Sequence, residues 1–348
     1  DLQGPKIRIQ RFRNGSVTLK EGQEFVLDPT MPADAGDEQG VGVAYANLPK
    51  DVHPGDTLLL DDGQIRLSVG AVAGSRVVCT VQVGGELGDK KGINRQGGGL
   101  SAPALDDKDR EDLAHAARLD FDWLAVSFVR SAADLHEARQ CLRDVDSEIH
   151  LIAKIERVEA VDNLKAIIDA SDGVMVARGD LAVETGYAGM TGLQKSIIRQ
   201  TRRRHKVSIT ATQMMESMIQ NQTPTRAEVS DVANAVMDGT DAVMLSAETA
   251  VGQYPVKTVQ AMAEVCIGAE SYHQSSAPMT RHRMDDRFGR VDEAVAMAAM
   301  YTANHLDVQA IIALTESGST ALWMSRIRSD IPIYALTRQP ATLRRVAL

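Results

Sequence analysis

The pattern of apolar and polar positions changes its period along this chain. Up to about residue 102, short runs alternate between apolar and polar side chains, as at 16–19 and 76–83. The residue pairs that separate such runs are Asn14-Gly15, Asp62-Gly63 and Gly74-Ser75. Alternation with a period of two predicts strands, and these pairs predict hairpin turns. Residues 5–102 are therefore predicted to form an all-β domain.

From Pro103 onward, strand-like runs alternate with helical patterns, which predicts parallel βαβ architecture. The predicted strands of this region are 123–129, 150–156, 173–178, 206–212 and 241–246. The predicted helices are 132–143, 158–170, 193–204 and 227–237. Thr225 and Glu228 have the spacing of a capping box at the start of the last of these helices. After a polar linker at 275–290, a final α/β region is predicted, with helices 292–305 and 320–329 and strands 309–315 and 332–337.

Each of the five middle strands is apolar until its C-terminal end, where polar residues begin. Polar ends on every strand favour a (β/α)₈ barrel, whose active site lies at the C-terminal ends of the strands. A doubly wound sheet would have its site at one switch point, usually with a Gly-rich loop. Five strands do not close a barrel. Asp1-Leu-Gln-Gly4 is expected to end a sixth strand, and two more are expected to precede residue 1.

Lys154, Glu156 and Asp180 end two successive apolar runs. Side chains alternate faces along a strand, so Lys154 and Glu156 are expected to point the same way. A salt-bridged pair at a strand end is one interpretation of these two residues. Two carboxylates beside a lysine also suit a divalent cation and an anion, because Mg²⁺ takes few carboxylates and lysine suits phosphate or an oxyanion.

Other polar residues at the strand ends add candidates. Gly179 has two interpretations. It is a plain turn glycine, or it lets the backbone approach a ligand closely, so that the N–H groups of Gly179 and Asp180 could bind a carboxylate. Thr212 is expected at the rim of the site, where it can bond a substrate. Ser246 and Glu248 have the same position on the last strand, although capping or ion pairing at the rim is an equal alternative.

Composition narrows the range of functions. The net charge of -9 argues against nucleic acid as a partner. The three cysteines are far apart and form no CxxC pair, which indicates neither a zinc knuckle nor a disulfide framework and favours a reducing cytoplasm. No apolar run approaches the roughly 18 residues that span a bilayer, so no membrane partner is expected.

Taken together, the motifs resemble the pyruvate kinase family, in its bacterial and potassium-independent form. The most specific segments are Ile152-Ala-Lys-Ile-Glu156, Val176-Ala-Arg-Gly-Asp-Leu181 and Thr210-Ala-Thr-Gln-Met214. Further matching segments, in family order, are 1–8, 89–94, 127–130, 224–228 and 244–249. The resemblance covers nearly the whole chain.

The resemblance implies an α/β fold. A (β/α)₈ TIM barrel, with its first strands missing from this chain, would comprise residues 1–4 and 103–272. An inserted all-β barrel domain at 5–102 would act as a lid, and a C-terminal α/β regulatory domain would occupy 273–348. The family is usually tetrameric, so a homotetramer is expected. The chain is expected to be truncated at both ends, and alone to be neither a closed barrel nor an active enzyme.

The resemblance also implies a reaction, phosphoryl transfer from phosphoenolpyruvate to ADP, giving pyruvate and ATP as the last step of glycolysis. By resemblance, Lys154 stabilises the transferring phosphoryl group, and Glu156 and Asp180 hold Mg²⁺ or Mn²⁺. The residues implied in binding phosphoenolpyruvate are Lys154, Arg178, Gly179, Asp180 and Thr212. Those implied near the nucleotide phosphates are Arg8 and Lys91. A proton relay through Thr212, Ser246 and water is our hypothesis for protonation of the enolate.

The chain departs from the family in two respects. The Arg-x-Asn-x-Ser-His-Gly motif of the first family strands, which supplies an arginine for phosphate, is absent. Many potassium-dependent members have glutamate at the position of Lys6 and threonine at that of Leu2. A lysine ammonium can replace a monovalent cation, so activity without K⁺ is expected. A merely solvated charge at Lys6 is the alternative.

The segment 315–321 joins a predicted strand to a helix and matches the effector loop of the family. The residues expected to bind a sugar-phosphate or nucleotide effector are Thr315, Ser317, Gly318, Ser319 and Thr320, through hydroxyls and N–H groups. Simple helix capping by Ser319 or Thr320 is the alternative. For the whole chain, two other functions stay open: a Mg²⁺-dependent lyase or aldolase of a related barrel, and a non-catalytic effector-binding module.

Overall fold

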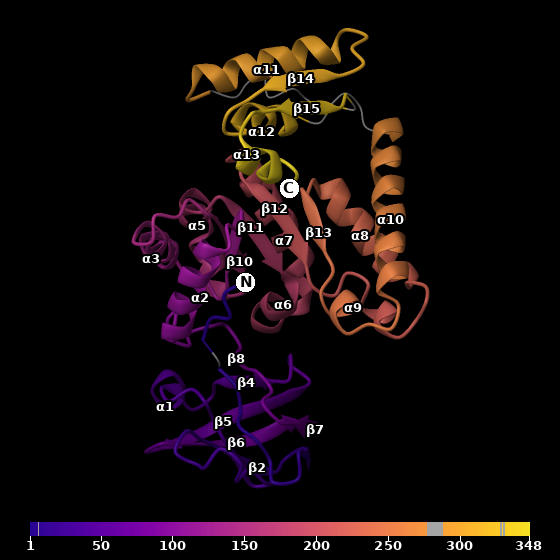
Figure 1. Cartoon of the computed structure of the whole chain (residues 1–348). Coiled ribbons are helices and arrows are strands. Elements are labelled where there is room, and N and C mark those ends of the chain that lie inside the picture. The colour runs from indigo at the N-terminus through magenta and orange to yellow at the C-terminus, as the bar shows by residue number, and fades with distance from the viewer. Residues whose placement is uncertain (6, 277–287, 328, 330) are drawn as a thin grey trace. The chain divides into compact units, whose positions relative to one another are not determined.

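The structure is a computed structural model that describes residues 1–5, 7–276, 288–327, 329 and 331–348 (Figure 1). These residues form two compact units. Unit 1 comprises residues 1–119, 124–170 and 176–194, and unit 2 comprises 120–123, 171–175 and 195–348. Lys6 and positions 277–287 of the predicted linker lie outside the described residues.

The N-terminal part of unit 1 is built from strands, as predicted. A six-stranded sheet has the order β3 (Gly40–Gly42), β2 (Glu24–Asp28), β6 (Arg76–Val83), β5 (Ile65–Ala73), β4 (Thr57–Leu60) and β8 (Ile93–Arg95). A second sheet pairs β1 (Ser16–Leu19) with β7 (Gly85–Gly88), and a short helix, α1, spans Leu48–Asp51. One apolar core, which includes Phe25, Leu58 and Leu67, fills this part.

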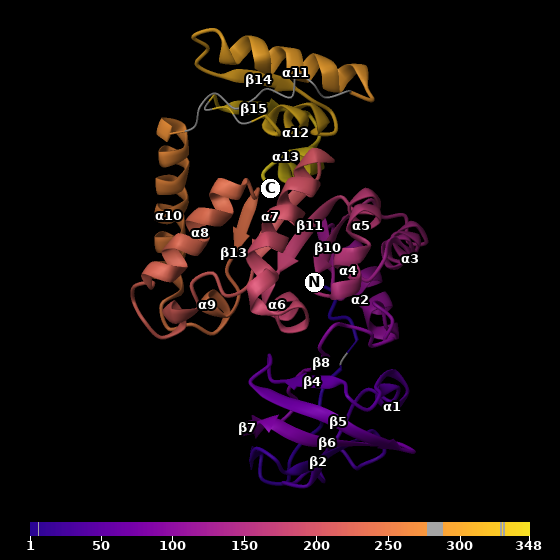
Figure 2. The same cartoon turned by 180° about the vertical axis from the view of Figure 1, so that it is seen from behind.

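Two of the three predicted hairpins are confirmed. Asp62-Gly63 joins β4 to β5, and Gly74-Ser75 joins β5 to β6, which lie side by side in both views (Figures 1 and 2). The hairpin predicted at Asn14-Gly15 is wrong, because β1 pairs instead with the distant β7, with Val17 opposite Leu87. Both of these side chains are buried, so burial across the sheet decides the pairing of β1.

The five strands predicted in the middle region form one sheet. Its order is β13 (Ala242–Met244), β12 (Val207–Ala211), β11 (Gly173–Ala177), β10 (His150–Ile155) and β9 (Trp123–Val126). Strands adjacent in sequence are adjacent in the sheet, and β12 and β13 are parallel. This order has no reversal at which a doubly wound sheet would place its site. Leu2 donates its N–H to the carbonyl of Ala125 at 2.9 Å, so residues 1–4 run beside β9 without being a strand themselves.

Several strand ends and helix starts differ from prediction. The helix predicted at 193–204 begins six residues earlier, as α7 (Tyr187–Arg203). Arg178 was expected to end a strand but begins helix α6 (Arg178–Thr185), so Gly179 and Asp180 lie in the first helical turn. The predicted helix 158–170 is divided into α4 (Val158–Asp162) and α5 (Leu164–Ala170). The predicted helix 132–143 is confirmed at both ends as α3 (Ala132–Arg143).

The remaining helices of the middle region precede, separate or follow these strands along the chain. They are α2 (Asp107–Arg118), α7 (Tyr187–Arg203), the 3₁₀ turn Glu216–Ile219, α8 (Arg226–Asp238), α9 (Ala247–Ala250) and α10 (Pro255–Ser276). The capping box of Thr225 and Glu228 is confirmed at the start of α8. No helix among the described residues is long and apolar enough to cross a membrane.

The predicted α/β region at the C-terminus is also confirmed. It comprises α11 (Val291–Asn304), β14 (Ile311–Leu314), α12 (Ser319–Ser325), β15 (Ile333–Leu336) and α13 (Pro340–Arg345). The strands β14 and β15 are parallel. An apolar cluster that includes Met300, Ala313 and Met324 joins α11, β14 and α12, so this region has its own core.

Candidate active site

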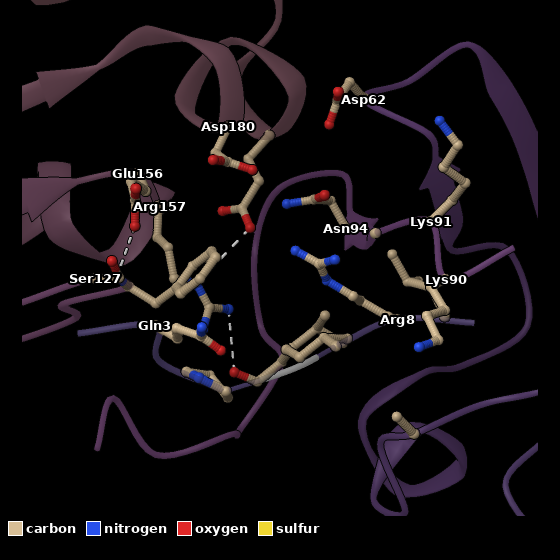
Figure 3. Close-up of a pocket in the computed structure, with 18 of the residues that line it drawn as sticks. Gln3, Arg8, Asp62, Lys90, Lys91, Asn94, Ser127, Glu156, Arg157 and Asp180 are labelled. Atoms are coloured by element: carbon tan, nitrogen blue, oxygen red, sulfur yellow. Dashed lines mark hydrogen bonds and ion pairs between the residues drawn. The ribbon is translucent and has the colours of Figure 1, made fainter. Parts of the chain in front are cut away.

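Unit 1 contains a cavity of about 940 Å³. It brings together five residues that the sequence predicted for metal, phosphoryl or nucleotide binding: Arg8, Lys91, Lys154, Glu156 and Asp180. Figure 3 shows the two carboxylates on one side of the cavity and Lys91 on the other, with Arg8 between them.

Lys154 and Glu156 lie at the C-terminal end of β10 and meet as predicted. The Nζ atom of Lys154 lies 2.7 Å from Oε1 of Glu156 and 3.0 Å from Oγ of Ser127. The other oxygen of Glu156 accepts the N–H of Phe128 at 2.7 Å. Glu156 is only 2% exposed, whereas 15% of the Lys154 side chain faces solvent. The ion pair therefore exists, and its lysine still reaches the cavity.

Asp180 projects into the same cavity from the first turn of α6. Burial raises the pKa of its carboxyl to about 6, and the nearby carboxylates of Glu156 and Asp62 act in the same direction. The cations Lys154 and Arg8 oppose this effect. A bound cation would remove the repulsion between Asp180 and Glu156, so the site fits a divalent metal.

The donor set also limits what such a metal can be. The described residues contain no group of three or more His, Cys, Asp or Glu side chains placed to hold a metal. Two carboxylates suit Mg²⁺, which keeps several positions for water and substrate oxygens, better than a metal enclosed by protein ligands. Mn²⁺ accepts the same oxygen ligands.

Arg178 has a different environment from the one expected. It is 9% exposed, and its Nη1 atom donates to Oε1 of Gln194 at 3.5 Å, from α6 to α7. Neither Arg178 nor Gly179 is among the described residues that line the cavity. The N–H groups of the first turn of a helix have no carbonyl partner within that helix, which leaves the predicted anion-binding role of Gly179 and Asp180 compatible with this geometry.

Thr212 and Ser246 belong to unit 2. Thr212 directly follows β12 in a left-handed conformation with a φ of 67°, and its hydroxyl donates to the carbonyl of Ala211 at 2.7 Å. Gln213 also has a positive φ, of 51°. Such conformations are costly for side chains with a Cβ and concentrate at functional sites. Ser246 precedes α9, and its N–H donates to Glu248 at 2.7 Å.

Sequence reasoning missed several residues of the cavity. Asp61 and Asp62 follow β4, and Asp61 pairs with Nζ of Lys91 at 2.8 Å. From the sequence, Asp62 was interpreted only as part of the turn pair Asp62-Gly63, and Asp61 was not considered. The other polar residues missed are Gln3, Gln10, Lys90, Asn94, Arg157 and Glu184. Asn94 lies on the three-residue strand β8, and the others come from loops and helix ends, so no periodic pattern marks them as site residues.

The segment expected to bind an effector has an internal hydrogen-bond network. The hydroxyl of Thr315 accepts the N–H of Gly318 at 2.9 Å, and the hydroxyls of Ser317 and Ser319 lie 2.8 Å apart. Gly318, with a φ of 87°, is the N-cap of α12 and has no side chain to cap it, and the N–H of Ser319 donates to the hydroxyl of Ser317 at 3.4 Å. Capping by Ser319 or Thr320 is therefore wrong. The binding of an effector stays a prediction.

Comparison with known proteins follows the same division of the chain. The family model "Pyruvate kinase, barrel domain" matches residues 1–259, and "Pyruvate kinase, alpha/beta domain" matches residues 293–348. Pyruvate kinase II of Salmonella typhimurium is 55% identical and the pyruvate kinase of Haemophilus influenzae 54% identical, over 100% of this chain and 73% of each relative. The crystal structure of a pyruvate kinase from Cryptosporidium parvum has a TM-score of 0.89 at 37% identity, covering 99% of this chain and 71% of that chain.

Proposed function

This chain belongs to the pyruvate kinase family, and from that premise we propose how its residues divide the work of transferring a phosphoryl group from phosphoenolpyruvate to ADP. The alternative of a lyase or aldolase is not favoured by relatives of this identity. We propose that residues 1–4 and 103–272 belong to a (β/α)₈ barrel, that 5–102 form the lid, and that 273–348 form a regulatory domain. The consecutive order of β9 to β13 supports the barrel.

One observation supports the mechanism most: Lys154 and Glu156, at the end of β10, and Asp180, in the first turn of the helix that follows the neighbouring strand β11, line one cavity. In the proposal, Glu156 and Asp180 hold Mg²⁺, which neutralises charge on the phosphoryl and enolate oxygens when it is bound. Lys154 presents its ammonium to the phosphoryl group during transfer. Phosphoryl transfer needs positioning and charge neutralisation more than covalent catalysis, and these three residues supply both.

The nucleotide would bind on the side of Arg8 and Lys91. Lys91 is 42% exposed and pairs with the carboxylate of Asp61, which is 13% exposed, so its ammonium could reach a phosphate oxygen from the cavity while Asp61 holds its position. Arg8 lies between this side and the carboxylates in the cavity (Figure 3). Its guanidinium presents a fork of donors suited to phosphate.

Further parts of the proposal concern the carboxylate of phosphoenolpyruvate, the enolate and the effector. Gly179 and Asp180, in the first turn of α6, would bind the carboxylate of phosphoenolpyruvate, with Thr212 and Arg178 as additional substrate residues. A relay through Thr212, Ser246 and water would protonate the enolate. The left-handed conformation of Thr212 supports a functional position. An effector at 315–320 and a homotetramer complete the proposal.

A coupled assay tests the proposed reaction. Pyruvate formation from phosphoenolpyruvate should require both ADP and Mg²⁺, and Lys154→Met should lower kcat by at least about 100-fold because a charge used in the transition state is lost. The matched control is Lys165→Met, which removes an exposed lysine of α5 and should change nothing. Activity without ADP would point to a lyase or phosphatase. No activity in the protein with its natural termini would point to an effector-binding module.

A further inference from the structure

A run of glycines leads out of the strand-rich part of unit 1. Gly97, Gly98 and Gly99 directly follow β8 and have φ values of 83°, 77° and 93°. We call residues 96–101 the glycine linker. Side chains rarely adopt these conformations, and a Cβ on Gly99 would lie 2.1 Å from Nη1 of Arg95. Glycine allows these backbone conformations. Because glycine also allows many others, the linker needs contacts from outside to keep one conformation.

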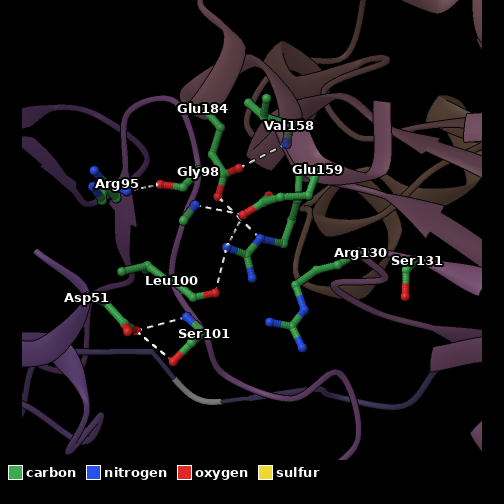
Figure 4. A network of polar contacts seen from close by, with 12 residues as sticks. Asp51, Arg95, Gly98, Leu100, Ser101, Arg130, Ser131, Val158, Glu159 and Glu184 are labelled. Atoms are coloured by element: carbon green, nitrogen blue, oxygen red, sulfur yellow. Dashed lines mark hydrogen bonds and ion pairs between the residues drawn. The ribbon is translucent and has the colours of Figure 1, made fainter. Parts of the chain in front are cut away.

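On one side, the linker backbone is bound by Glu184, Glu159 and Arg157, and Figure 4 shows Glu159 and Leu100 of this set. On the other side, Thr57, Arg95 and Asp51 bind the backbone of Gln96, Gly98 and Ser101. The N–H of Gly97 donates to the carbonyl of Glu184 at 3.2 Å. The N–H of Gly99 donates to Oε1 of Glu159 at 2.6 Å. The carbonyl of Leu100 accepts Nη2 of Arg157 at 3.1 Å. The linker is therefore held at three of its residues by α4, by the residue before α4, and by the end of α6.

Arg157 is the centre of this arrangement. It is 2% exposed, and its guanidinium lies 3.3 Å from Glu159 and 3.7 Å from Glu184. Glu184 in turn accepts the N–H of Val158 at 3.1 Å. A buried guanidinium is costly unless it is paired, so its position is determined by these two carboxylates and the carbonyl of Leu100. Arg157 is also the residue next to Glu156, which ties it to the end of β10.

The linker is connected to both sides of the cavity. Leu100 and Asn94 line the cavity, and Asn94 donates a side-chain hydrogen bond to Glu184. β8, which precedes the linker, pairs with β4, and β4 leads directly to Asp61, the partner of Lys91. A shift of the linker would therefore move the side of the cavity that carries Lys91 relative to the side that carries Glu156.

We propose that Arg157, together with Glu159, is a positioning residue that clamps the glycine linker and so sets the geometry of the nucleotide side of the cavity. The proposal rests on the nucleotide role proposed for Arg8 and Lys91. It assigns Arg157 no contact with substrate. Loss of the clamp should weaken the use of ADP more than that of phosphoenolpyruvate, because the proposed phosphoenolpyruvate ligands of unit 1 lie on β10 and α6 and not on the linker.

Steady-state kinetics of the protein with its natural termini provide the test. Arg157→Met and Glu159→Ala should raise the KM for ADP by about tenfold and about threefold, and leave the KM for phosphoenolpyruvate within about twofold. Arg157→Lys keeps the positive charge but lacks the forked donors of the guanidinium. Its KM for ADP should therefore lie between those of the wild type and Arg157→Met. The control Arg13→Met removes an arginine whose side chain is 65% exposed and should behave like the wild type.

The two KM values of the variants decide whether Arg157 and Glu159 position the linker. An unchanged KM for ADP in Arg157→Met and Glu159→Ala would overturn the clamp, as would equal increases in both KM values, since a purely structural defect gives no such split. If Arg157→Met fails to fold, Glu159→Ala decides, because the Glu159 side chain is 29% exposed and tolerates truncation better. A wild type that forms no pyruvate with ADP would contradict the proposed function itself, which is a different outcome from an active wild type with unaffected variants.

Discussion

At the scale of single residues, the site depends on charges that burial makes costly. Glu156 uses both of its oxygens, one for Lys154 and one for the N–H of Phe128. Burial and the repulsion of neighbouring carboxylates raise the pKa of Asp180, and the cations Lys154 and Arg8 only partly oppose them. A cation bound beside this carboxylate would favour its charged form, so the titration of Asp180 should report metal binding.

The substitution Asp180→Asn tests whether the buried charge of Asp180 destabilises the protein without metal. Burial raises the pKa of Asp180 from 3.8 to about 6, so between these values the folded protein keeps a proton that the unfolded chain has lost. As pH rises through that window, this group lowers the free energy of unfolding by up to about 3 kcal/mol. Without metal, the variant should be more stable than the wild type above pH 6 and equal to it below pH 3.8.

Thermal unfolding with and without Mg²⁺ measures both effects. Mg²⁺ should raise the Tm of the wild type but not that of Asp180→Asn, because the variant has lost one of two metal ligands. Asp162→Asn, at an exposed aspartate of α4, is the charge-matched control and should respond like the wild type. An equal Mg²⁺ response in Asp180→Asn and the wild type would exclude Asp180 as a ligand.

At the scale of elements, three helices begin with the same hydrogen-bonding motif. The helices α2, α3 and α8 each begin with a capping box, formed by Asp106 and Asp109, Ser131 and Asp134, and Thr225 and Glu228. The glutamate of the last box also accepts the N–H and hydroxyl of Ser217, at 2.7 and 2.6 Å. Glu228 therefore joins the 3₁₀ turn at 216–219 to α8, as well as capping α8.

Glu228→Gln should weaken both contacts. Burial alone would raise the pKa of Glu228, but hydrogen bonds from Ser217 and Thr225 outweigh it and lower the pKa below 4.5. Its contribution to stability is then present above pH 4.5 and lost as pH falls through the lowered pKa. Urea unfolding at pH 7 should show a loss of about 1 kcal/mol relative to the wild type.

The loss should shrink in acid, where the wild-type carboxylate is protonated as well. Ser230→Ala, at an exposed serine of α8 outside the box, serves as the control and should cost less than about 0.5 kcal/mol. A loss for Glu228→Gln that is independent of pH would show that the charge of Glu228 contributes nothing to the box.

At the scale of the whole molecule, the expected potassium independence is the property most open to a direct test. Lys6 lies outside the described residues, so the prediction rests on the sequence and on the family resemblance alone. If an ammonium replaces the monovalent cation, activity at constant ionic strength should be the same in K⁺ and in tetramethylammonium salts. Stimulation by K⁺ of about tenfold or more would contradict the role of Lys6.

Lys6→Glu provides the converse measurement. Removal of the internal cation should lower kcat in the absence of K⁺, and added K⁺ should restore part of it, because the carboxylate can then bind the ion. Lys20→Glu, with the same charge change at an exposed position after β1, should acquire no K⁺ dependence. If K⁺ does not activate the Lys6→Glu variant, Lys6 of the wild type is only a solvated charge and does not replace a cation.

The sequence by itself determined the element types and the charged residues at the strand ends. Period-two and helical patterns act over a few residues, so they correctly predicted the five strands β9 to β13, helix α3 and the box at Thr225. The same locality explains why Lys154 and Glu156, two residues apart on one strand, could be placed together in advance.

Only the tertiary structure decided which distant segments meet. Local pattern predicted a hairpin at Asn14-Gly15, whereas burial of Val17 against Leu87 pairs β1 with β7. The ion pair between Lys91 and Asp61 and the hold of Arg157 on Leu100 likewise join loops that carry no periodic signal. Their partners are selected by burial and by the need to satisfy buried charges across the fold, and neither depends on neighbouring residues in the sequence.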